Sequence, residues 1–470
     1  MTIIIEKMDE VYSRISKRDA QFIAKGVEWT SFYWKKNNFG FKEKVVYKDN
    51  IFMHKTPTHC EFYSGFLPRI RSYCDSHHLT LSIASSHNAP LPHVPPNLPK
   101  IEGFLEFRND QLQLIQLMRR HRRGVIKSAT GTGKTIMQLG IMSCFPDINI
   151  LLLAHTNEIV YQTYEKLLNF GFEGVVRMGD SSGHSGPEGR ITVCTRQTFI
   201  KFDPKSYRDY YQMVIIDEGH HISAMRKTDK SKGEYIRVLE NLNAQIRLGF
   251  TATMPKEMDR LMAIEGLLGP IIGEVTLNDA VNEGILAQPK IRILKSSLSD
   301  TVRKERKYDG VYKKGIVDNH SRNVQIMGEA KRWIDEEKSV LILVTALDHG
   351  QNLLTIAQQL GINAVFLRGE TKQCERQEMK EAFIARDLPC IIASVIWVEG
   401  VDIPNLNVVI NAAGGKGELR TLQKIGRGLR KTNDKEECVI VDFFDPSHNY
   451  LIAQFGERIT LYMDNNWKFI

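Results

Sequence analysis

The sequence predicts an α/β protein in which two tandem domains, each a parallel sheet flanked by helices, follow a small α+β domain. The chain has 470 residues, enough for about three domains. From residue 101 onward, short aliphatic runs alternate with helical patterns, which is typical of buried parallel strands and their crossover helices. The predicted divisions are a small domain over 1–88, a proline-rich linker over 89–100, a first sheet domain over 101–287, an interdomain linker over 288–320 and a second sheet domain over 321–470.

The composition is that of an ordinary globular protein, with 42% hydrophobic and 25% charged residues. It excludes a disordered chain, a collagen and a disulfide-stapled mini-protein. The formal net charge is +8, and residues 1–100 hold 14 Lys and Arg against 9 Asp and Glu, so they carry +5 of it. A basic first domain favours a polyanionic partner.

No apolar run approaches the roughly 20 residues that span a bilayer, and the start MTIIIEKMDEVY does not resemble a secretory signal. The seven cysteines contain no CxxC pair, which indicates reduced thiols. We therefore expect a soluble, cytoplasmic protein. His59, Cys60, Cys74, His77 and His78 offer zinc ligands, but their spacing matches no standard finger, and ordinary buried or surface side chains are the favoured interpretation.

The small domain is expected to combine strands and a helix. Alternation over 42–53 predicts short antiparallel strands, and LPRIRSYCDSHH at 67–78 predicts a helix. Five prolines within 89–99 break any helix or central strand, so this stretch is read as a linker.

The two sheet domains are read from their aliphatic runs, which we expect to be buried parallel strands. In the first domain these runs lie at 125–127, 148–154, 191–195, 213–217 and 246–252. In the second they lie at 340–344, 363–367, 390–394, 407–411 and 438–442.

A glycine-rich loop, SATGTGKT at 128–135, stands between an expected strand and an expected helix. In this context glycines let backbone N–H groups surround phosphate oxygens, and the helix N-terminus favours negative charge. Lys134 would contact the β- and γ-phosphates of a nucleotide and Thr135 would hold Mg²⁺. Ser128 stands where the strict pattern has glycine, so an ordinary glycine turn is the alternative. The candidate phosphate-binding residues are Thr130, Gly131, Thr132, Gly133, Lys134 and Thr135.

An acidic pair ends another apolar strand, MVIIDEGHH at 213–221. A phosphate-loop ATPase needs one carboxylate for Mg²⁺ and a second to activate water. Asp217 fits the metal role and Glu218 fits the general base. A solvated strand end is the alternative, which the position of the pair after a phosphate loop disfavours.

Together these residues resemble a superfamily 2 helicase with a DExH box, over most of residues 105–445. The resemblance implies two RecA-like domains that hydrolyse ATP with Mg²⁺. FRNDQ at 107–111 resembles the adenine-sensing segment, so Arg108 and Gln111 would bind the base. DEGH at 217–220 resembles the DExH box, and GFTATM at 249–254 resembles the Thr-Ala-Thr motif. His220, Thr251 and Thr253 would then couple hydrolysis to movement on DNA.

Other motifs assign strand contacts and the second domain. AHTNEIVYQ at 154–162, TRQT at 195–198 and LRGET at 367–371 resemble the motifs that hold the nucleic-acid strand. EGVDIP at 399–404 and QKIGRGLR at 423–430 resemble the fifth and sixth motifs, in which arginine fingers complete catalysis. The residues implied are Thr156, Asn157, Thr195, Gln197, Arg368 and Gly369 for DNA, Gly400 and Asp402 for the nucleotide, Gln423 for coupling, and Arg427 and Arg430 as catalytic fingers beside Lys134 and Glu218.

The motif set looks like the XPB/RadD branch of DNA helicases. The N-terminal stretch 32–74 resembles the small first domain of UvsW-type phage helicases, which act on branched DNA; a phage source would place the protein in the host cytoplasm. Lys35, Lys36 and Arg69 are therefore expected to contact DNA, with aromatic side chains stacking on unpaired bases. The alternative is a small sheet with an aromatic core and a solvated lysine face.

The leading hypothesis is an ATP-dependent DNA helicase that unwinds or branch-migrates Holliday junctions, forks and R-loops in recombination, repair or replication restart. Branched or partly duplex DNA is the expected partner, with no membrane partner and a monomer as the simplest state. The alternatives are an RNA helicase, the motor subunit of a restriction system, or a non-catalytic DNA-binding scaffold.

Overall fold

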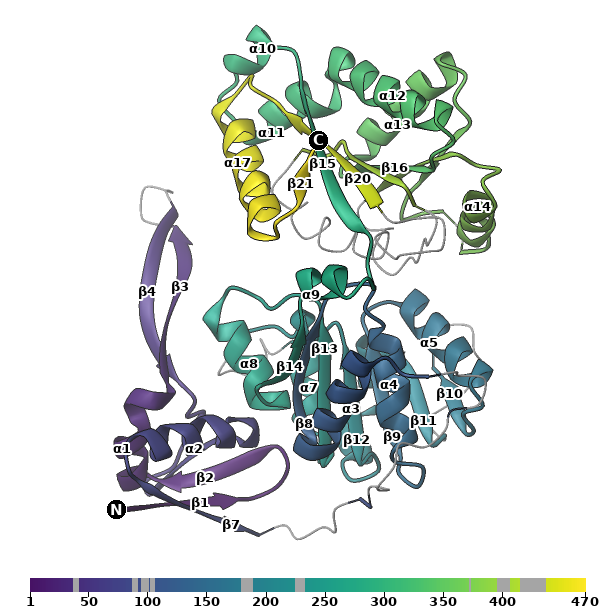
Figure 1. Ribbon diagram of the computed structural model, residues 1–470. Helices are drawn as coiled ribbons and strands as arrows, with labels where there is room; N and C mark the ends of the chain where they lie inside the picture. Colours follow the sequence, from purple (N-terminus) through teal and green to yellow (C-terminus); the bar gives the residue numbers. More distant parts are fainter. Residues whose placement is uncertain are drawn as a thin grey trace. The chain divides into compact units, whose positions relative to one another are not determined.

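The computed structural model describes residues 1–36, 42–86, 92–93, 101, 106–178, 189–224, 233–371, 373–394, 406–414 and 437–470, with side chains except at 32–36, 42–43, 54 and 373. These residues form two compact units, Met1–Ser128 with Gly133–Glu274, and Val275–Ile470 with Ala129–Thr132 (Figure 1). Within the described residues, every helix is too short or too polar to cross a bilayer.

The first unit begins with an N-terminal module, residues 1–86, built on a mixed sheet of strand order β5-β6-β2-β1-β7. Burial alternates along β2, so one face of the sheet points to a core while the other meets solvent. Ser16 caps α1 by accepting a hydrogen bond from the Asp19 backbone at 3.0 Å. The elements are β1 (Thr2–Lys7), β2 (Tyr12–Ser16), α1 (Lys17–Val27), β5 (His54–Lys55), β6 (His59–Tyr63), α2 (Leu67–Ser76) and β7 (Thr80–Ser85). The helix predicted at 67–78 is confirmed by α2.

A separate antiparallel hairpin leaves this module, formed by β3 (Glu28–Lys36) and β4 (Lys42–Asn50). Figure 1 shows it as a long two-stranded ribbon apart from the module's sheet. Ser31 lies directly opposite Tyr47 in its register. The strand predicted from the alternation over 42–53 is thereby confirmed at β4.

The rest of the first unit is a seven-stranded sheet with the order β10-β11-β9-β12-β13-β8-β14 and helices packed against it (Figure 1). Strands β9, β11 and β13 are buried along their whole length, as continuous aliphatic runs require. The strands are β8 (Arg123–Ser128), β9 (Ile150–Ala154), β10 (Val175–Arg177), β11 (Ile191–Thr195), β12 (Met213–Asp217), β13 (Ile246–Thr251) and β14 (Ile271–Val275). The helices are α3 (Asn109–His121), α4 (Lys134–Ser143), α5 (Asn157–Asn169), α6 (Arg196–Phe199), α7 (Glu234–Leu239) and α8 (Met258–Leu268).

The N-terminal module and the first sheet domain share one hydrophobic core, which runs from Ile3 to Leu268. They pack tightly at α8, where a Cβ on Gly266 would lie 2.7 Å from the Tyr63 ring and 2.8 Å from the Phe66 ring. Polar contacts reinforce the packing, since the Arg123 guanidinium donates to the Glu10 carbonyl at 3.0 Å. The module predicted over 1–88 is therefore built into the first unit.

This shared core predicts the outcome of a truncation. Removing residues 1–86 would expose the apolar side of α8, so we expect the shortened chain to aggregate. Soluble yield and size-exclusion chromatography of the truncated and full chains measure this. A monodisperse truncated protein with an unchanged unfolding midpoint would show that the module folds and functions apart from the sheet domain.

The second unit holds another seven-stranded parallel sheet, with the order β17-β18-β16-β19-β20-β15-β21. Its strands are β15 (Gln288–Lys295), β16 (Val340–Val344), β17 (Ala364–Leu367), β18 (Cys390–Ser394), β19 (Val408–Asn411), β20 (Glu437–Phe444) and β21 (Lys468–Phe469). Its helices are α9 (Leu277–Asn282), α10 (Asp300–Arg303), α11 (Tyr308–Tyr312), α12 (His320–Asp335), α13 (Leu347–Gln359), α14 (Gln373–Ala385) and α17 (Asn449–Asp464). The ten predicted strands of the two domains are all confirmed.

The interdomain linker predicted at 288–320 is wrong. Residues 288–295 form β15, which pairs with β20 and β21 inside the second sheet. Val302, Val311 and Ile316 then form a small buried core with Leu451 of α17. Along β15 the charged side chains alternate with buried ones, as they do in a half-buried strand. The proline-rich linker at 89–100 lies outside the described residues apart from 92 and 93.

The cysteine and histidine cluster of the N-terminal module has a plain structural role. Cys60 and Cys74 are buried in the core, with exposed fractions of 5% and 0%. His77 stacks on Tyr73 with the ring centroids 4.0 Å apart. Among the described residues no group of three or more His, Cys, Asp or Glu side chains is arranged to hold a metal ion.

Candidate functional site

The glycine-rich loop joins β8 to α4, as predicted. Gly131 and Gly133 adopt φ of 89° and 92°, a conformation that L side chains rarely reach. A Cβ on Gly133 would also lie 2.5 Å from Gln111 Nε2, so a larger residue would have to displace this amide. Within the loop, the Thr132 hydroxyl donates to the Ala129 carbonyl at 2.7 Å. The backbone therefore has the tight shape that phosphate binding requires at the start of a helix.

Lys134, the first residue of α4, lies with its ammonium group between two acceptors. Its Nζ donates to the Ser128 carbonyl at 3.3 Å and lies 3.8 Å from Glu218 Oε1. Both side chains are largely buried, with exposed fractions of 10% and 14%. A cation and a carboxylate are thus held together at the loop, and the catalytic roles of Lys134 and Glu218 stay predictions.

Asp217 is the last residue of β12, and Glu218 begins the turn that follows it. Glu218 has a left-handed backbone with φ of 51°, which turns its side chain out of the strand direction. Asp217 Oδ1 accepts a hydrogen bond from Gln138 Nε2 at 3.1 Å. Gln138 was not predicted, although its position four residues after Lys134 on the same helix face could have indicated it.

His220 joins the acidic pair to the Thr-Ala-Thr segment. Its Nδ1 lies 2.9 Å from the Thr251 hydroxyl and 3.3 Å from Glu218 Oε2. Thr251 is fully buried and donates to the Thr253 carbonyl at 2.8 Å. Hydrogen bonds therefore link the three predicted coupling residues of the first unit, His220, Thr251 and Thr253, and His220 also lies beside the Glu218 carboxylate.

The predicted adenine-sensing residues lie at the start of α3. Gln111 is 2% exposed, and its Oε1 accepts from the Arg108 backbone at 3.2 Å. The Arg108 guanidinium pairs with Asp110 at 2.9 Å. Since Gln111 Nε2 also faces Gly133, the structure brings Gln111 beside the glycine-rich loop.

The strand-contacting candidates of the first unit lie on neighbouring strands. Thr156 and Thr195 follow β9 and β11, which pair in parallel, so both stand at the same edge of the sheet. Each threonine caps the helix that follows by accepting a backbone hydrogen bond. Asn157 and Gln197, the next candidates along the chain, are exposed on those helices.

A second set of side chains, absent from the predictions, lies near this edge. His155 and His221 stack with ring centroids 3.5 Å apart and an interplanar angle of 3°. Arg196 contacts His155 Nδ1 at 2.9 Å and Glu234 at 3.1 Å. His221 comes directly after the DEGH motif and Arg196 lies within the TRQT motif, so their motif membership could have indicated them.

In the second unit, Arg368 and Gly369 form an exposed turn after β17. The turn is closed by hydrogen bonds in both directions between Arg368 and Thr371, at 3.1 and 3.2 Å, and by Arg376, which donates to the Gly369 carbonyl at 2.5 Å. Five predicted residues of the second unit lie outside the described residues: Gly400, Asp402, Gln423, Arg427 and Arg430. The side chains of Lys35 and Lys36 in the N-terminal module are not described either.

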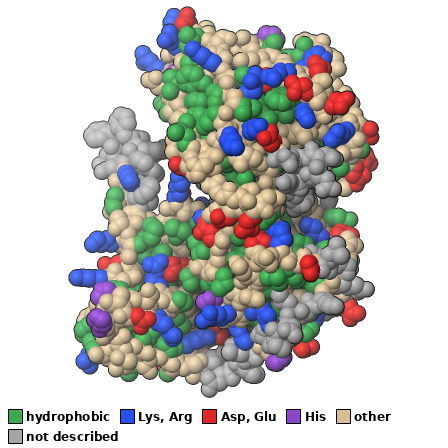
Figure 2. All heavy atoms as spheres, in the orientation of Figure 1, with side chains coloured by type: hydrophobic (Ala, Val, Ile, Leu, Met, Phe, Trp, Pro, Cys, Tyr) green, Lys and Arg blue, Asp and Glu red, His purple; other side chains and the backbone are tan. Residues whose placement is uncertain are grey.

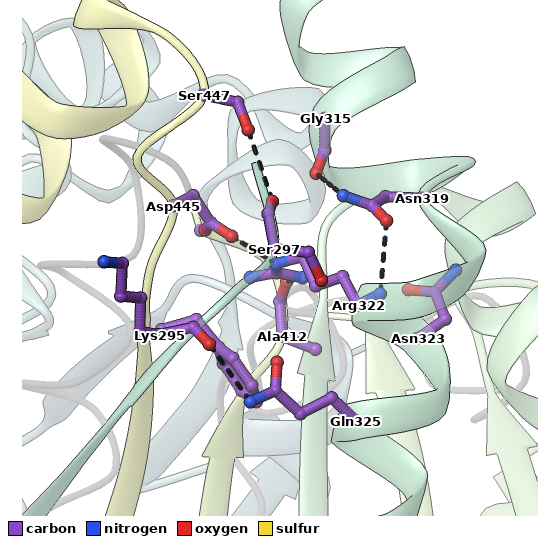
Figure 3. A network of polar contacts seen from close by, with 12 residues as sticks. Lys295, Ser297, Gly315, Asn319, Arg322, Asn323, Gln325, Ala412, Asp445 and Ser447 are labelled. Carbon is purple, nitrogen blue, oxygen red and sulfur yellow. Dashed lines mark hydrogen bonds and ion pairs between the residues drawn. The ribbon is translucent and has the colours of Figure 1, made fainter. Parts of the chain in front are cut away.

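The backbone just before residues 415–436 is fixed by buried donors. Residues 412–414 follow β19, and their three carbonyls accept hydrogen bonds from three different helices. Arg322 of α12 donates at 2.7 Å, Tyr312 of α11 at 3.0 Å and Arg458 of α17 at 3.0 Å. Figure 3 shows Arg322 at the centre of this network, between Ala412 and Asp445, with which it pairs at 2.8 Å. The chain therefore leaves β19 from a defined position.

Arg69, predicted to contact DNA, has another partner. Its guanidinium forms two hydrogen bonds to the Glu265 carboxylate, at 2.7 and 2.6 Å. This pairing raises the pKa of Arg69 and commits two of its donors to α8. The structure thus places Arg69 at the join between the N-terminal module and the sheet domain, and its contact with DNA stays a prediction.

Two protein families match the chain. Residues 101–256 match the family described as "Type III restriction enzyme, res subunit", and residues 322–432 match "Helicase conserved C-terminal domain". The chain is 26% identical to the DNA 3'-5' translocase XPB2 of Sulfurisphaera tokodaii, over 73% of this chain and 82% of that protein. It is 22% identical to the ATP-dependent DNA helicase uvsW of Enterobacteria phage T4, over 74% of each.

A solved structure agrees with the fold. Saccharomyces cerevisiae Dbp5 bound to RNA and ADP BeF3 superposes with a TM-score of 0.56 at 18% identity, covering 78% of this chain and 90% of that one. The chain also aligns with three further curated helicases, and these alignments cover only 54%, 64% and 56% of the length of those proteins. Two RecA-like domains of matching families, in this order, identify the chain as a member of the superfamily 2 helicases.

Proposed function

We propose that this protein hydrolyses ATP to move along DNA, and that it unwinds or branch-migrates branched DNA such as Holliday junctions, forks and R-loops. The observation that carries the proposal is the arrangement around the glycine-rich loop. Lys134 of the loop and Glu218 and His220 of the DEGH segment are brought together there from two separate segments of the chain. The same chain of contacts continues to Thr251, so a change at the carboxylate has a physical route into the sheet domain.

The residues present suit a nucleotide with Mg²⁺. Gly131 and Gly133 hold the loop in a left-handed backbone conformation at the start of α4, where backbone N–H groups can bind phosphate oxygens. Thr135 and Asp217 would hold the metal, with Gln138 orienting the Asp217 carboxylate. When bound, Mg²⁺ neutralises charge on the phosphates.

Each side chain then has a defined task in hydrolysis. Lys134 would bind the terminal phosphates, a contact for which it must give up part of its interaction with Glu218. Glu218 would orient the attacking water and take its proton. Gln111 would select adenine, and Arg427 and Arg430 would stabilise charge that develops on the γ-phosphate.

DNA is the proposed nucleic acid because of the relatives and the charge. The names of both relatives describe enzymes of DNA, and the first hundred residues hold most of the net positive charge. Figure 2 shows Lys and Arg side chains spread over one face of the N-terminal module, with acidic ones among them. Such a distribution suits contacts with phosphates at several points. We propose an intracellular protein, and a role in recombination, repair or replication restart follows from the branched substrate.

One other function has a specific observation in its favour. The family that matches residues 101–256 takes its name from the restriction subunit of type III enzymes, which supports a motor subunit of a restriction system as the second candidate. In that case ATP use would depend on a partner complex and on a recognition sequence, and branched DNA would give no advantage.

The proposal is tested by comparing how nucleic acids stimulate ATP hydrolysis. We expect single-stranded and forked DNA to raise the ATPase rate at least about tenfold over the basal rate, and RNA of the same sequence to do so far less, as P-loop motors gain most of their rate when completed by a partner. Phosphate release measured with matched DNA and RNA oligonucleotides gives the answer. Stimulation by RNA alone would refute the proposal.

A further inference from the structure

The base of the β3–β4 hairpin is tied to a single carboxylate of the sheet domain. Asp259, in the first turn of α8, accepts a hydrogen bond from Trp29 Nε1 at 2.7 Å, one from the Ser31 hydroxyl at 2.7 Å and one from the Tyr47 hydroxyl at 2.6 Å. The three donors come from both strands and from sites more than two hundred residues away in the sequence.

The register of the hairpin explains why the three donors converge. Trp29 and Ser31 are two residues apart on β3, so their side chains project from the same face. Tyr47 stands directly opposite Ser31 on β4 and joins them on that face. Trp29 and Ser31 are each 7% exposed, so water competes little for these bonds. Burial and the bond to Asp259 raise the pKa of Tyr47, which keeps its hydroxyl protonated as a donor at neutral pH.

The next residue of α8 reaches the candidate ATP site. Arg260 donates to the backbone carbonyl of His220, and its Nε donates to the Ile222 carbonyl at 3.4 Å. Adjacent residues of an α-helix point about 100° apart, so one turn of α8 contacts the hairpin on one side and the DEGH segment on the other. Asp259 and Arg260, neighbours in one turn of α8, therefore link the two through side-chain hydrogen bonds.

The rest of α8 is held to the N-terminal module as well. Arg69 pairs with Glu265, and a Cβ on Gly65 would lie 2.3 Å from the carbonyl oxygens of Glu265 and Gly266. Packing this close leaves little room for α8 to slide against the module, because interiors at normal density resist small shifts. The base of the hairpin is likewise held to the start of α8 by the three bonds to Asp259, so the two move together.

We propose that Asp259 and Arg260 are a positioning pair that ties the β3–β4 hairpin to the DEGH segment, so that the state of the ATP site sets the position of the hairpin on branched DNA. The proposal rests on the proposed function for its nucleotide dependence. Asp259 fixes the hairpin to α8, and Arg260 fixes α8 to His220, which in turn contacts Glu218 and Thr251. Neither residue touches the reacting atoms, so both act through others.

The attachment itself is tested in the full chain without nucleotide, by hydrogen–deuterium exchange of peptides from β4. We expect Asp259→Ala to raise the exchange of the β4 amides at least about tenfold, since hydrogen bonds to a charged acceptor are the stronger ones. Tyr47→Phe removes one donor and should give a smaller increase in the same peptides. It also keeps the test valid if Asp259→Ala folds poorly. Exchange at β4 equal to that of the wild type in both variants would overturn the proposal.

The coupling is tested by comparing ATP hydrolysis with unwinding. In Arg260→Met and Asp259→Ala, we expect ATPase on single strands to stay within about twofold of the wild type while unwinding of forked DNA falls about tenfold, because one lost charged hydrogen bond shifts a docking equilibrium by roughly that factor. A bound ATP analogue should alter β4 exchange in the wild type, and Arg260→Met should abolish that response. A merely structural role would lower both activities together.

The chain provides a matched control pair on another helix. Asp300 and Arg303 of α10 lie 3.8 Å apart with side chains 86% and 61% exposed, so Asp300→Ala and Arg303→Met should change none of these readouts. Unwinding at the wild-type rate in both Asp259→Ala and Arg260→Met would refute the coupling while leaving the proposed function intact. A wild type without any ATPase would refute the proposed function, and the β4 exchange without nucleotide would still decide the attachment.

Discussion

Lys134→Ala is expected to abolish ATP hydrolysis while leaving DNA binding intact. The ammonium group is the cation closest to Glu218 among the described residues, and its removal deprives the terminal phosphates of their charge partner at the loop. We expect the rate to fall at least about a hundredfold, which is the usual loss when one preorganised charge donor is removed. Phosphate release at saturating DNA measures the rate, and anisotropy of labelled DNA measures binding.

The matched control for this variant is Lys127→Ala. Lys127 lies on β8, just before the loop, and pairs with Glu274 at 2.6 Å in a half-exposed bridge. Such bridges contribute little, so the control should keep both its ATPase and its unfolding midpoint. DNA binding should be unchanged in Lys134→Ala as well, because that side chain is only 10% exposed. Turnover near the wild-type rate in Lys134→Ala would disprove the assignment of the site.

Arg247→Met is expected to cause the largest loss of stability in the first unit. The Arg247 side chain is fully buried and donates to the carbonyls of Leu267, Leu242 and Leu239 at 2.7, 2.8 and 2.8 Å. Burial lowers the pKa of Arg247 to about 9, so it remains charged at neutral pH. Methionine fills a similar volume but leaves three buried carbonyls without these donors, which should cost about 3–5 kcal/mol of unfolding free energy.

Urea unfolding followed by circular dichroism measures this loss, with Arg332→Met as the control. Arg332 lies on α12 with 48% of its side chain exposed, forms long pairs of 3.6 Å with Glu329 and Glu336, and lies 5.1 Å from the Trp333 ring centroid. Its replacement should shift the unfolding free energy by about 0.5 kcal/mol or less. An Arg247→Met protein with the midpoint of the wild type would show that the three carbonyls are satisfied in another way.

The sheet strands were predictable because continuous aliphatic runs in the sequence indicate strands that are buried on both faces. Runs such as ILLLA and MVIID are buried on both faces, and only a parallel sheet covered by helices places such runs in a domain of this size. Strand β15 escaped prediction because Lys290 and Arg292 interrupt its apolar positions. It lies beside the two-residue strand β21, where one face is only half covered.

The residues of the loop and of the acidic pair could be identified because they are close in sequence or belong to recurrent motifs, while their chemical roles stay predictions. Lys134 stands in the loop itself, and the acidic pair ends a strand whose parallel neighbours all finish at the same edge. The short distance from Lys134 to Glu218 then follows from the topology of the sheet.

The join between the module and the sheet domain could not be predicted, because it depends on pairs far apart in the chain. Arg69 was expected to contact DNA because residues 32–74 resemble the first domain of UvsW-type helicases. Its partner Glu265 lies 196 residues away on a helix with no recognisable motif. No motif in the sequence around Asp259 indicates its role either, because only the fold brings the three hairpin donors to its carboxylate.

The measurement that tests the account most directly is ATP-dependent processing of a synthetic Holliday junction, compared with a plain tailed duplex of the same sequence. We expect the wild type to convert the junction into its two splayed products faster than it unwinds the duplex, and only with hydrolysable ATP. Lys134→Ala should do neither. A protein that hydrolyses ATP on DNA but leaves junctions and forks intact would contradict the account.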